Sequence, residues 1–387
     1  MKKKKFKMIR NIVSIFVVVV LLFGIFAIVR NLTATASTDK LSKTKKNTKT
    51  MAEVSTEKAD NSVPMTELTV SAPKTSIRVG EEMQLAISHK PENATNTKLK
   101  WKCSKGGMVT ITKDGILKPT KKSGKNTVTV KAYATDGSKL STSFRLRIYP
   151  AIDPSKPMVA ITFDDGPNPD TTNIMLDALE QNYAKATFFC LGQNAGYYPE
   201  TVKREFDLGM EVATHTYSHV QLTTLSNEKL QEEIDKSMDA IKKATGISPT
   251  LLRPPYGAVN KSVLSVVGEN KLCCVNWSLD TEDWKTKNAN ATYNMVMKAT
   301  DGDVVLLHDI HEYNVDAVKR FVPDLIAQGF QLVTVPELYA ARGETLEAGT
   351  IHYRTDPTTQ ESEETTAASS EDGAVQTDTE AETTQGN

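Results

Sequence analysis

Residues 158–167 read MVAITFDDGP, and this stretch decides how the second half of the chain folds. Val159–Phe163 form a run that is apolar except for Thr162, which predicts a β-strand buried on both faces. Asp164 and Asp165 follow the run directly, and a Gly-Pro pair then forces a turn. A buried strand that ends in two carboxylates is typical of a parallel sheet with its functional groups at the carboxyl ends of the strands.

The same alternation of strand and helix continues through residues 151–343, which we take as one domain. Further strands are predicted at Ala186–Leu191, Glu211–Thr214, Leu251–Arg253, Leu272–Ser278, Val304–Leu307 and Gln331–Val335. Helices are predicted between them at Thr171–Gln181, Glu228–Ala244 and Asn314–Ala327. Seven such β/α units predict a small, incomplete (β/α) barrel.

Polar clusters stand just past the ends of five of these strands, at the face where (β/α) barrels carry their active sites. The clusters are TFDDGP (162–167), HTYSH (215–219), RPPYG (253–257), DTEDW (280–284) and LLH (306–308). Three of the chain's six histidines lie in them. Their shared position predicts one site assembled from all five loops.

The HTYSH cluster suits a metal ion. On a helical turn, His215 and His219 would lie on one face and could bind one ion through two imidazoles. Asp165 as third ligand would leave coordination positions open for water and substrate, and Asp164 would remain to handle protons. A histidine pair or an Asp-Asp-Gly-Pro turn alone is more often an ordinary surface, core or turn feature. Finding both at one barrel end, beside an arginine and a third histidine, favours the metal site.

Two residues in the third cluster, RPPYG, suit the chemistry of acyl transfer. Arg253 can pair with a carboxylate and keep it ionised. Tyr256 precedes Gly257, whose conformational freedom permits a sharp turn that aims a backbone N–H at a developing oxyanion. The alternative for Arg253 is a surface cation, which its place between an apolar strand and two prolines disfavours.

The last two clusters suit a general acid and an apolar pocket. Asp283 can orient His308 and raise its pKa, so that the imidazolium can donate a proton. Trp284 and Leu306 would form the walls of a small apolar pocket, although either alone is more often a core residue.

Taken together and in order, the five clusters resemble the motifs of the polysaccharide deacetylase (NodB homology) family, carbohydrate esterase family 4, over roughly residues 155–342. The resemblance implies a distorted (β/α) barrel with one divalent metal ion, commonly Zn²⁺, with Co²⁺ or another ion as alternatives. It implies Asp165, His215 and His219 as metal ligands. It also implies these further roles: Asp164 as general base steadied by Arg253, the Tyr256 N–H in the oxyanion hole, His308 as general acid tuned by Asp283, and Pro255, Trp284 and Leu306 at the substrate.

The family implies hydrolysis of an N-acetyl group on a polysaccharide. The architecture is most like that of membrane-anchored peptidoglycan N-acetylglucosamine deacetylases, so the expected substrate is N-acetylglucosamine in cell-wall peptidoglycan. Alternatives are the same chemistry on N-acetylmuramic residues, chitin oligomers, exopolysaccharide or acetyl xylan. An alternative of another class is a non-catalytic wall-binding or adhesion protein, against which the complete set of metal-binding and proton-handling residues argues.

Residues 66–150 have a different pattern, with short alternating segments separated by turn signals. Six or seven such strands predict a small all-β sandwich, with Trp101 on a middle strand as the core plug. The order of a VGE turn, a P-x-N-A loop, a strand tryptophan and a D-G turn resembles the bacterial Ig-like domain of group 2. This segment has 16 basic and 6 acidic residues, which indicates either attraction to an anionic wall polymer or simple solubility.

The ends of the chain suggest where the protein acts. Residues 1–11 carry six basic residues and no acidic one, and the apolar run 12–29 is long enough to cross a bilayer. This predicts a single-pass cell-membrane protein with an extracellular catalytic domain; secretion after cleavage of a signal peptide is the alternative. Residues 30–65 read as a disordered linker and residues 344–387 as an acidic disordered tail.

The overall composition excludes several classes of protein. Lysine plus arginine and aspartate plus glutamate both number 47, and the charge is distributed unevenly among the segments, which argues against a nucleic-acid-binding body. Four cysteines in 387 residues exclude a disulfide-built scaffold. No obligate protein partner is inferred.

Overall fold

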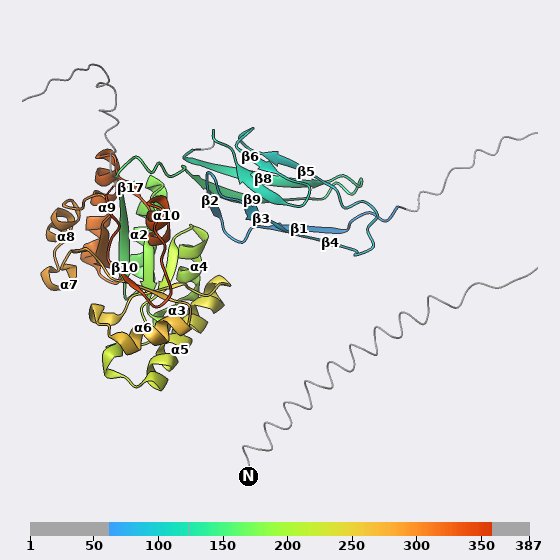
Figure 1. Cartoon of the computed structure of the whole chain (residues 1–387). Coiled ribbons are helices and arrows are strands. Elements are labelled where there is room, and N and C mark those ends of the chain that lie inside the picture. Colours follow the sequence, from blue (N-terminus) through green and yellow to red (C-terminus); the bar gives the residue numbers. More distant parts are fainter. Residues whose placement is uncertain (1–61, 123, 358–387) are drawn as a thin grey trace, which may run out of the picture. The chain divides into compact units, whose positions relative to one another are not determined.

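The computed structural model describes residues 62–122 and 124–357 (Figure 1). The predicted membrane-spanning segment 12–29 lies outside them, as do most of the linker and the end of the acidic tail. Within the described ranges, no helix combines the length and the apolar character needed to cross a membrane.

The barrel domain is built on one parallel sheet, so the predicted β/α architecture is confirmed in its coarse form as a curled half-barrel. Its strand order is β15-β16-β10-β11-β12-β13-β14-β18, with β17 paired to β10. The strands are β10 (Met158–Asp164), β11 (Thr187–Cys190), β12 (Glu211–Thr214), β13 (Leu251–Leu252), β14 (Cys273–Val275), β15 (Leu279–Asp280), β16 (Val304–His308), β17 (Gln331–Leu332) and β18 (Ile351–His352). The register of β10 and β16 places Asp164 opposite His308, so two of the sequence clusters meet directly.

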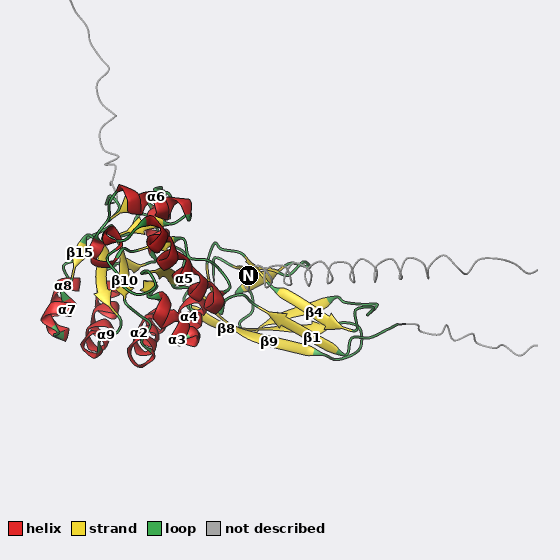
Figure 2. Cartoon of the chain, turned by 90° about the horizontal axis from the view of Figure 1, so that it is seen from below, coloured by secondary structure: helices red, strands yellow, loops and turns green. Residues whose placement is uncertain are grey.

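Helices surround the strands, as Figure 2 shows in red. They are α2 (Pro169–Asn182), α3 (Gly192–Tyr197), α4 (Pro199–Asp207), α5 (Asn227–Thr245), α6 (Lys261–Glu269), α7 (Asp283–Thr286), α8 (Ala289–Val296), α9 (Glu312–Ala327) and α10 (Val335–Ala341). Helix α5 is one residue longer at each end than the predicted Glu228–Ala244: Ser226 precedes its first residue, and Gly246 ends it in the left-handed region at a φ of 84°. The short helices between the predicted ones carry too little periodicity to be recognised from sequence.

Strand β10 divides its side chains between two cores, because successive residues of a strand point to opposite faces. Val159, Ile161 and Phe163 pack with residues of α2 and α9, and Phe163 stacks on Phe188 with ring centroids 5.0 Å apart. Met158 and Ala160 belong to the other core. By the same alternation, the last residue of the strand, Asp164, points to the interior of the barrel rather than to the helices.

The carboxyl-terminal segment contributes to the fold more than its sequence predicts. Strand β18 pairs with β14, Arg354 bridges to Asp303, and Thr355 is fully buried. The prediction that disorder begins at residue 344 is therefore wrong for residues 344–357. Local composition there is polar, and the segment is ordered by tertiary contacts with β14, with Asp303 and with Tyr339.

The amino-terminal domain is all β, as predicted. Strands β1 (Glu67–Ser71) and β4 (Ala86–Lys90) pair with each other, and the remaining strands form a four-stranded and a three-stranded sheet. These strands are β2 (Ser76–Arg78), β9 (Ser141–Tyr149), β8 (Asn126–Ala134) and β5 (Leu99–Cys103) in the first, and β3 (Met83–Gln84), β7 (Ile116–Pro119) and β6 (Val109–Ile111) in the second.

Trp101 does not fill the core of this domain from a middle strand, so that prediction is wrong. Strand β5 is an edge strand, and Trp101 is only partly buried. The centre of the core is filled by smaller side chains such as Leu117, Val130 and Leu146, which are fully buried. Because an edge strand has a neighbouring strand on one side only, the Trp101 side chain is not covered by another strand on its other side.

The first prediction concerns the barrel core. We expect Phe321→Ala in α9 to lower the free energy of unfolding of the barrel domain by about 3–5 kcal/mol, because a fully buried ring is replaced by a cavity. Urea titration followed by the helical circular dichroism signal would measure it. The control Ile174→Ala, on the exposed part of α2, should stay within about 0.5 kcal/mol of the unchanged protein. Equal losses for the two variants would contradict this packing.

Candidate active site

The turn after β10 separates two adjacent carboxylates. Asp164 is buried at the end of the strand, whereas Asp165 takes a left-handed backbone conformation with a φ of 73° and is only partly buried. Asn194 of α3 fixes this turn by donating to the Asp165 carbonyl at 2.8 Å. A Cβ on Gly166 would lie 2.2 Å from an oxygen of Asp309, so any larger residue here would displace that buried side chain. The side chains of Asp164 and Asp165 therefore point in different directions although the two residues are adjacent in the chain.

His215 and His219 meet as predicted in space but not by the predicted geometry. Residues 215–219 form a loop, not a helical turn, in which Thr216 and His219 both have positive φ angles of 70° and 61°. The loop brings the two imidazole rings to 5.0 Å between centroids. Sequence spacing alone could not reveal the two left-handed residues that make this possible.

Asp165 lies against both imidazoles. Its Oδ1 is 3.6 Å from Nε2 of His215 and 3.4 Å from Nε2 of His219. Nδ1 of His215 lies 2.7 Å from the Arg253 carbonyl, which can only accept, so Nδ1 carries the hydrogen and Nε2 presents a lone pair. Burial lowers the pKa of His215 to about 3 and keeps the ring neutral, as a ligand must be.

These three side chains fit a divalent cation. Their ligand atoms lie within 4.8 Å of one another, and Asp165 Oδ1 is buried without a hydrogen-bond partner among the described residues. An unpaired buried carboxylate oxygen is costly, and a cation would satisfy it. Two imidazoles and one carboxylate are the donor set of hydrolytic metal sites that keep coordination positions open.

Arg253 fixes the position of the Asp164 carboxylate. It is fully buried, and Nη1 donates to Asp164 Oδ1 and to Thr162 Oγ1, both at 2.7 Å. Its other nitrogens donate to the Val275 and Asn276 carbonyls at 2.9 Å. Burial raises the pKa of Asp164, and the guanidinium opposes that rise. The carboxylate is thus oriented and more basic than an exposed aspartate.

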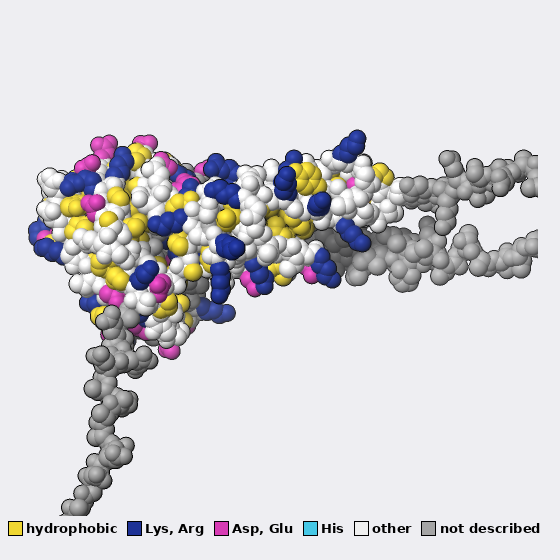
Figure 3. All heavy atoms as spheres, turned by 90° about the horizontal axis from the view of Figure 1, so that it is seen from above, with side chains coloured by type: hydrophobic (Ala, Val, Ile, Leu, Met, Phe, Trp, Pro, Cys, Tyr) yellow, Lys and Arg dark blue, Asp and Glu magenta, His cyan; other side chains and the backbone are white. Residues whose placement is uncertain are grey.

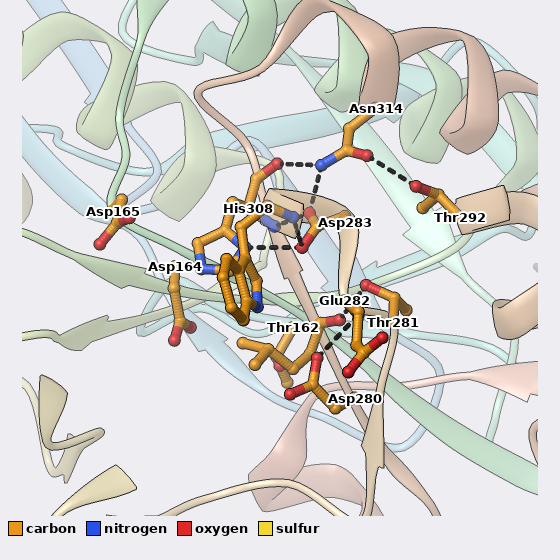
Figure 4. A network of polar contacts seen from close by, with 12 residues as sticks. Thr162, Asp164, Asp165, Asp280, Thr281, Glu282, Asp283, Thr292, His308 and Asn314 are labelled. Atoms are coloured by element: carbon orange, nitrogen blue, oxygen red, sulfur yellow. Dashed lines mark hydrogen bonds and ion pairs between the residues drawn. The ribbon is translucent and has the colours of Figure 1, made fainter. Parts of the chain in front are cut away.

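His308 lies on the opposite side of the site and is bound to Asp283 (Figure 4). Nδ1 of His308 and Asp283 Oδ1 are 2.8 Å apart, and the backbone N–H of His308 donates to Oδ2 at 2.9 Å. Burial alone would lower the pKa of His308, but the hydrogen bond and charge of Asp283 outweigh it and raise the pKa to about 9. The imidazole is therefore held in its protonated form near neutral pH.

Asn314 completes this arrangement and was not identified from the sequence. Its side-chain amide donates to Asp283 Oδ2 and to the His308 carbonyl, and it accepts from Thr292 at 3.3 Å. Figure 4 shows this line of contacts from Thr292 to His308. Asn314 lies in the first turn of α9 with no motif around it, so no sequence signal could have pointed to it.

These groups surround a cavity of about 570 Å³. Its lining comprises Asp164, Asp165, His215, His219, Tyr256, Trp277, Asp280, Trp284, Leu306 and His308. Trp284 and Tyr256 are 52% and 67% exposed, so their rings are accessible at the mouth. Pro255 is buried and does not line the cavity, so its predicted place at the substrate is not supported.

Trp277 and Asp280 line the cavity and were missed by the sequence analysis. Asp280 opens the DTEDW cluster, which could have marked it, and its Oδ1 accepts from the Glu282 N–H at 2.8 Å. Trp277 lies after β14, in a stretch predicted as strand, and only the tertiary structure shows that it reaches the cavity.

The second prediction is that the described chain binds one Zn²⁺ ion through this cluster. We expect His215→Ala and His219→Ala each to weaken binding by about a hundredfold or more, because each removes one of three ligands. Isothermal titration of the metal-free protein with Zn²⁺ would measure it. His311→Ala removes a histidine outside the cluster and is the matched control. Similar affinities for all three variants would place the ion elsewhere.

Comparison with known proteins identifies both domains. Residues 151–275 match the polysaccharide deacetylase family, and residues 64–142 match the bacterial Ig-like domain (group 2). The peptidoglycan-N-acetylmuramic acid deacetylase PdaC of Bacillus subtilis is 44% identical over 188 residues, which are 48% of this chain and 40% of PdaC. The match thus spans less than half the length of that relative.

Two shorter proteins are matched over almost their whole length. A peptidoglycan-N-acetylglucosamine deacetylase of Bacillus cereus is 38% identical over 187 residues, 47% of this chain and 87% of the relative. The solved structure of T48 deacetylase with substrate is 38% identical, with a TM-score of 0.50, over 52% of this chain and 100% of that one. The chain therefore belongs to the polysaccharide deacetylase family.

Proposed function

We propose that the protein is a metal-dependent hydrolase that removes N-acetyl groups from N-acetylglucosamine in peptidoglycan and releases acetate. The observation that carries this proposal is the placement of a buried carboxylate, Asp164, and a protonated imidazole, His308, opposite each other on β10 and β16, with the Asp165–His215–His219 cluster beside them. Hydrolysis of an amide needs a base for the water and an acid for the leaving amine, and these two groups meet that need.

Asp164 is the proposed general base. Arg253 orients the carboxylate, and burial makes it more basic, so it can take a proton from water that attacks the acetyl carbonyl. A divalent ion bound by the cluster, which we propose to be Zn²⁺, would polarise that carbonyl and acidify the water. The backbone N–H of Tyr256, in a turn with a φ of 61°, is the proposed donor to the oxyanion.

His308 is the proposed general acid. Its Nδ1 is committed to Asp283, so Nε2–H is the group that can give its proton to the amine nitrogen as the C–N bond breaks. Water and the amide are thereby converted to acetate and a free amine. Trp284 and Leu306 give the acetyl methyl an apolar surface, and the Trp277 ring adds a face for the sugar.

The substrate assignment rests on the relatives and on the layout of the chain. The Bacillus cereus relative is named for N-acetylglucosamine, whereas PdaC is named for N-acetylmuramic acid, so the muramic residue is the second candidate. The basic residues 1–11 and the apolar run 12–29 support a membrane anchor, which would hold the catalytic domain at the outer face of the membrane close to the wall.

The third prediction tests the reaction. Purified peptidoglycan should lose acetate when treated with the protein, and Asp164→Asn should reduce the rate by about 10²–10⁴-fold because it removes the base. Acetate would be quantified together with the free amino groups of the wall sugars, which are tagged by dinitrophenylation before acid hydrolysis because the acid itself removes all remaining acetyl groups. Tagged glucosamine should appear; tagged muramic acid would instead support the second candidate. A rate unchanged by Asp164→Asn would refute the role of that carboxylate.

The fourth prediction concerns pH. His308 acts only while protonated, so the rate should fall as the pH rises through its pKa. Asp283→Asn removes the charge that raises this pKa, so the alkaline limb of the kcat/KM profile should move to lower pH. The control Glu282→Gln changes the neighbouring exposed acid, which pairs with Lys285, and should leave the limb in place. An alkaline limb at the same pH in both variants would mean that His308 is not the acid.

A further inference from the structure

The Ig-like domain has a groove of about 660 Å³ on its open side. Strand β4 and the edge strand β5 form two of its walls, and the β6–β7 turn forms a third. Ile87, Leu99, Trp101 and Ile111 provide its apolar surface, and Lys98 and Lys113 stand at its rim. None of these residues belongs to the catalytic site.

The apolar surface of the groove is open to solvent. Ile87 is 37% exposed, and Trp101 is only partly buried although it is the one tryptophan of the domain. Elsewhere in the same core, Leu117 and Ile148 are completely buried. An accessible aromatic ring beside aliphatic side chains suits the C–H face of a sugar ring, because such a face is apolar while its hydroxyl groups remain in water.

The rim of the groove carries positive charge without a counter-charge. Lys98 and Lys113 are exposed, and neither has a carboxylate within ion-pair distance in the part of the chain that the structure describes. Lys90, by contrast, pairs with Glu67. No acidic side chain lines the groove. Figure 3 shows Lys and Arg side chains spread over the β-sandwich, and residues 66–150 have 16 basic against 6 acidic residues.

We infer that this groove binds the carboxylate-bearing sugar strand of peptidoglycan, with a sugar ring on Trp101 and stem-peptide carboxylates at Lys98 and Lys113. The inference rests on the proposed function for the identity of the polymer. Charge complementarity favours an anionic occupant, and the Trp101 ring in the lining favours a strand of sugar rings over a phosphate polymer. Binding at a second point would raise the concentration of acetamido groups at the catalytic site.

The test measures affinity separately from turnover. The full chain carrying Asp164→Asn is mixed with insoluble peptidoglycan stripped of phosphate polymers, and binding is measured by sedimentation. The double variant Lys98→Glu/Lys113→Glu is compared with Lys121→Glu/Lys122→Glu, which makes the same charge change at exposed positions that do not line the groove. A second arm uses the same peptidoglycan after its carboxylates have been amidated.

We expect the groove variant to bind peptidoglycan about tenfold or more weakly than the protein with an unchanged groove, and the control variant to stay within about twofold of it. Amidation of the peptidoglycan should weaken binding by the protein with an unchanged groove to the same extent as the groove substitutions do. Equal affinities of the two double variants for peptidoglycan would overturn the inference. So would an affinity that amidation does not change, or binding only to peptidoglycan that retains its phosphate polymers. Acetate release by the protein from soluble N-acetylglucosamine oligomers is measured in parallel. If the protein releases acetate but the groove variant binds peptidoglycan as tightly as the unchanged groove, only the inference about the groove is refuted. If the protein releases no acetate, the proposed function is refuted.

Discussion

The buried contact between Arg253 and Asp164 is the interaction on which the site depends. Removing one partner of such a pair leaves an uncompensated charge in the interior, at a cost of about 3–5 kcal/mol. Arg253 also binds the Thr162 hydroxyl and the carbonyls of Val275 and Asn276 at the end of β14, and so connects β10, β13 and β14. Its own carbonyl accepts from His215. One residue therefore orients both the proposed base and a proposed metal ligand.

On the opposite side of the site, His308 and Asp283 also form a largely buried pair of opposite charges held by hydrogen bonds. Asp283 is buried and receives four donors, from the ring and backbone of His308, from the Asn314 amide and from the backbone N–H of Trp284. This fixes the ring and keeps it cationic, whereas His215, buried without a carboxylate on its Nδ1, stays neutral. Two histidines of the same cavity are thus held in opposite protonation states, which is what a ligand and an acid require.

Much of this could be predicted from sequence because the relevant signals are local. The apolar run of β10 and the polar clusters after five strands follow from short-range patterns, and parallel strands place those clusters at one edge. The helical turn assigned to His215 and His219 was wrong because two left-handed residues shape that loop. Asn314, Trp277 and the ordered segment 344–357 depend on tertiary contacts that leave no periodic signal. The prediction that Trp101 fills the core was wrong because the sequence does not reveal which strand forms the edge of a sheet.

The central claim is that one cation, held by Asp165, His215 and His219, works with Asp164 and His308 to release acetate. The most direct measurement is a titration of the chelator-treated protein with Zn²⁺ while acetate release from peptidoglycan is followed. The account predicts no release without metal, and a rate that rises in proportion to the ion bound and reaches its plateau at one ion per chain. Full acetate release from protein shown to be free of metal would contradict it.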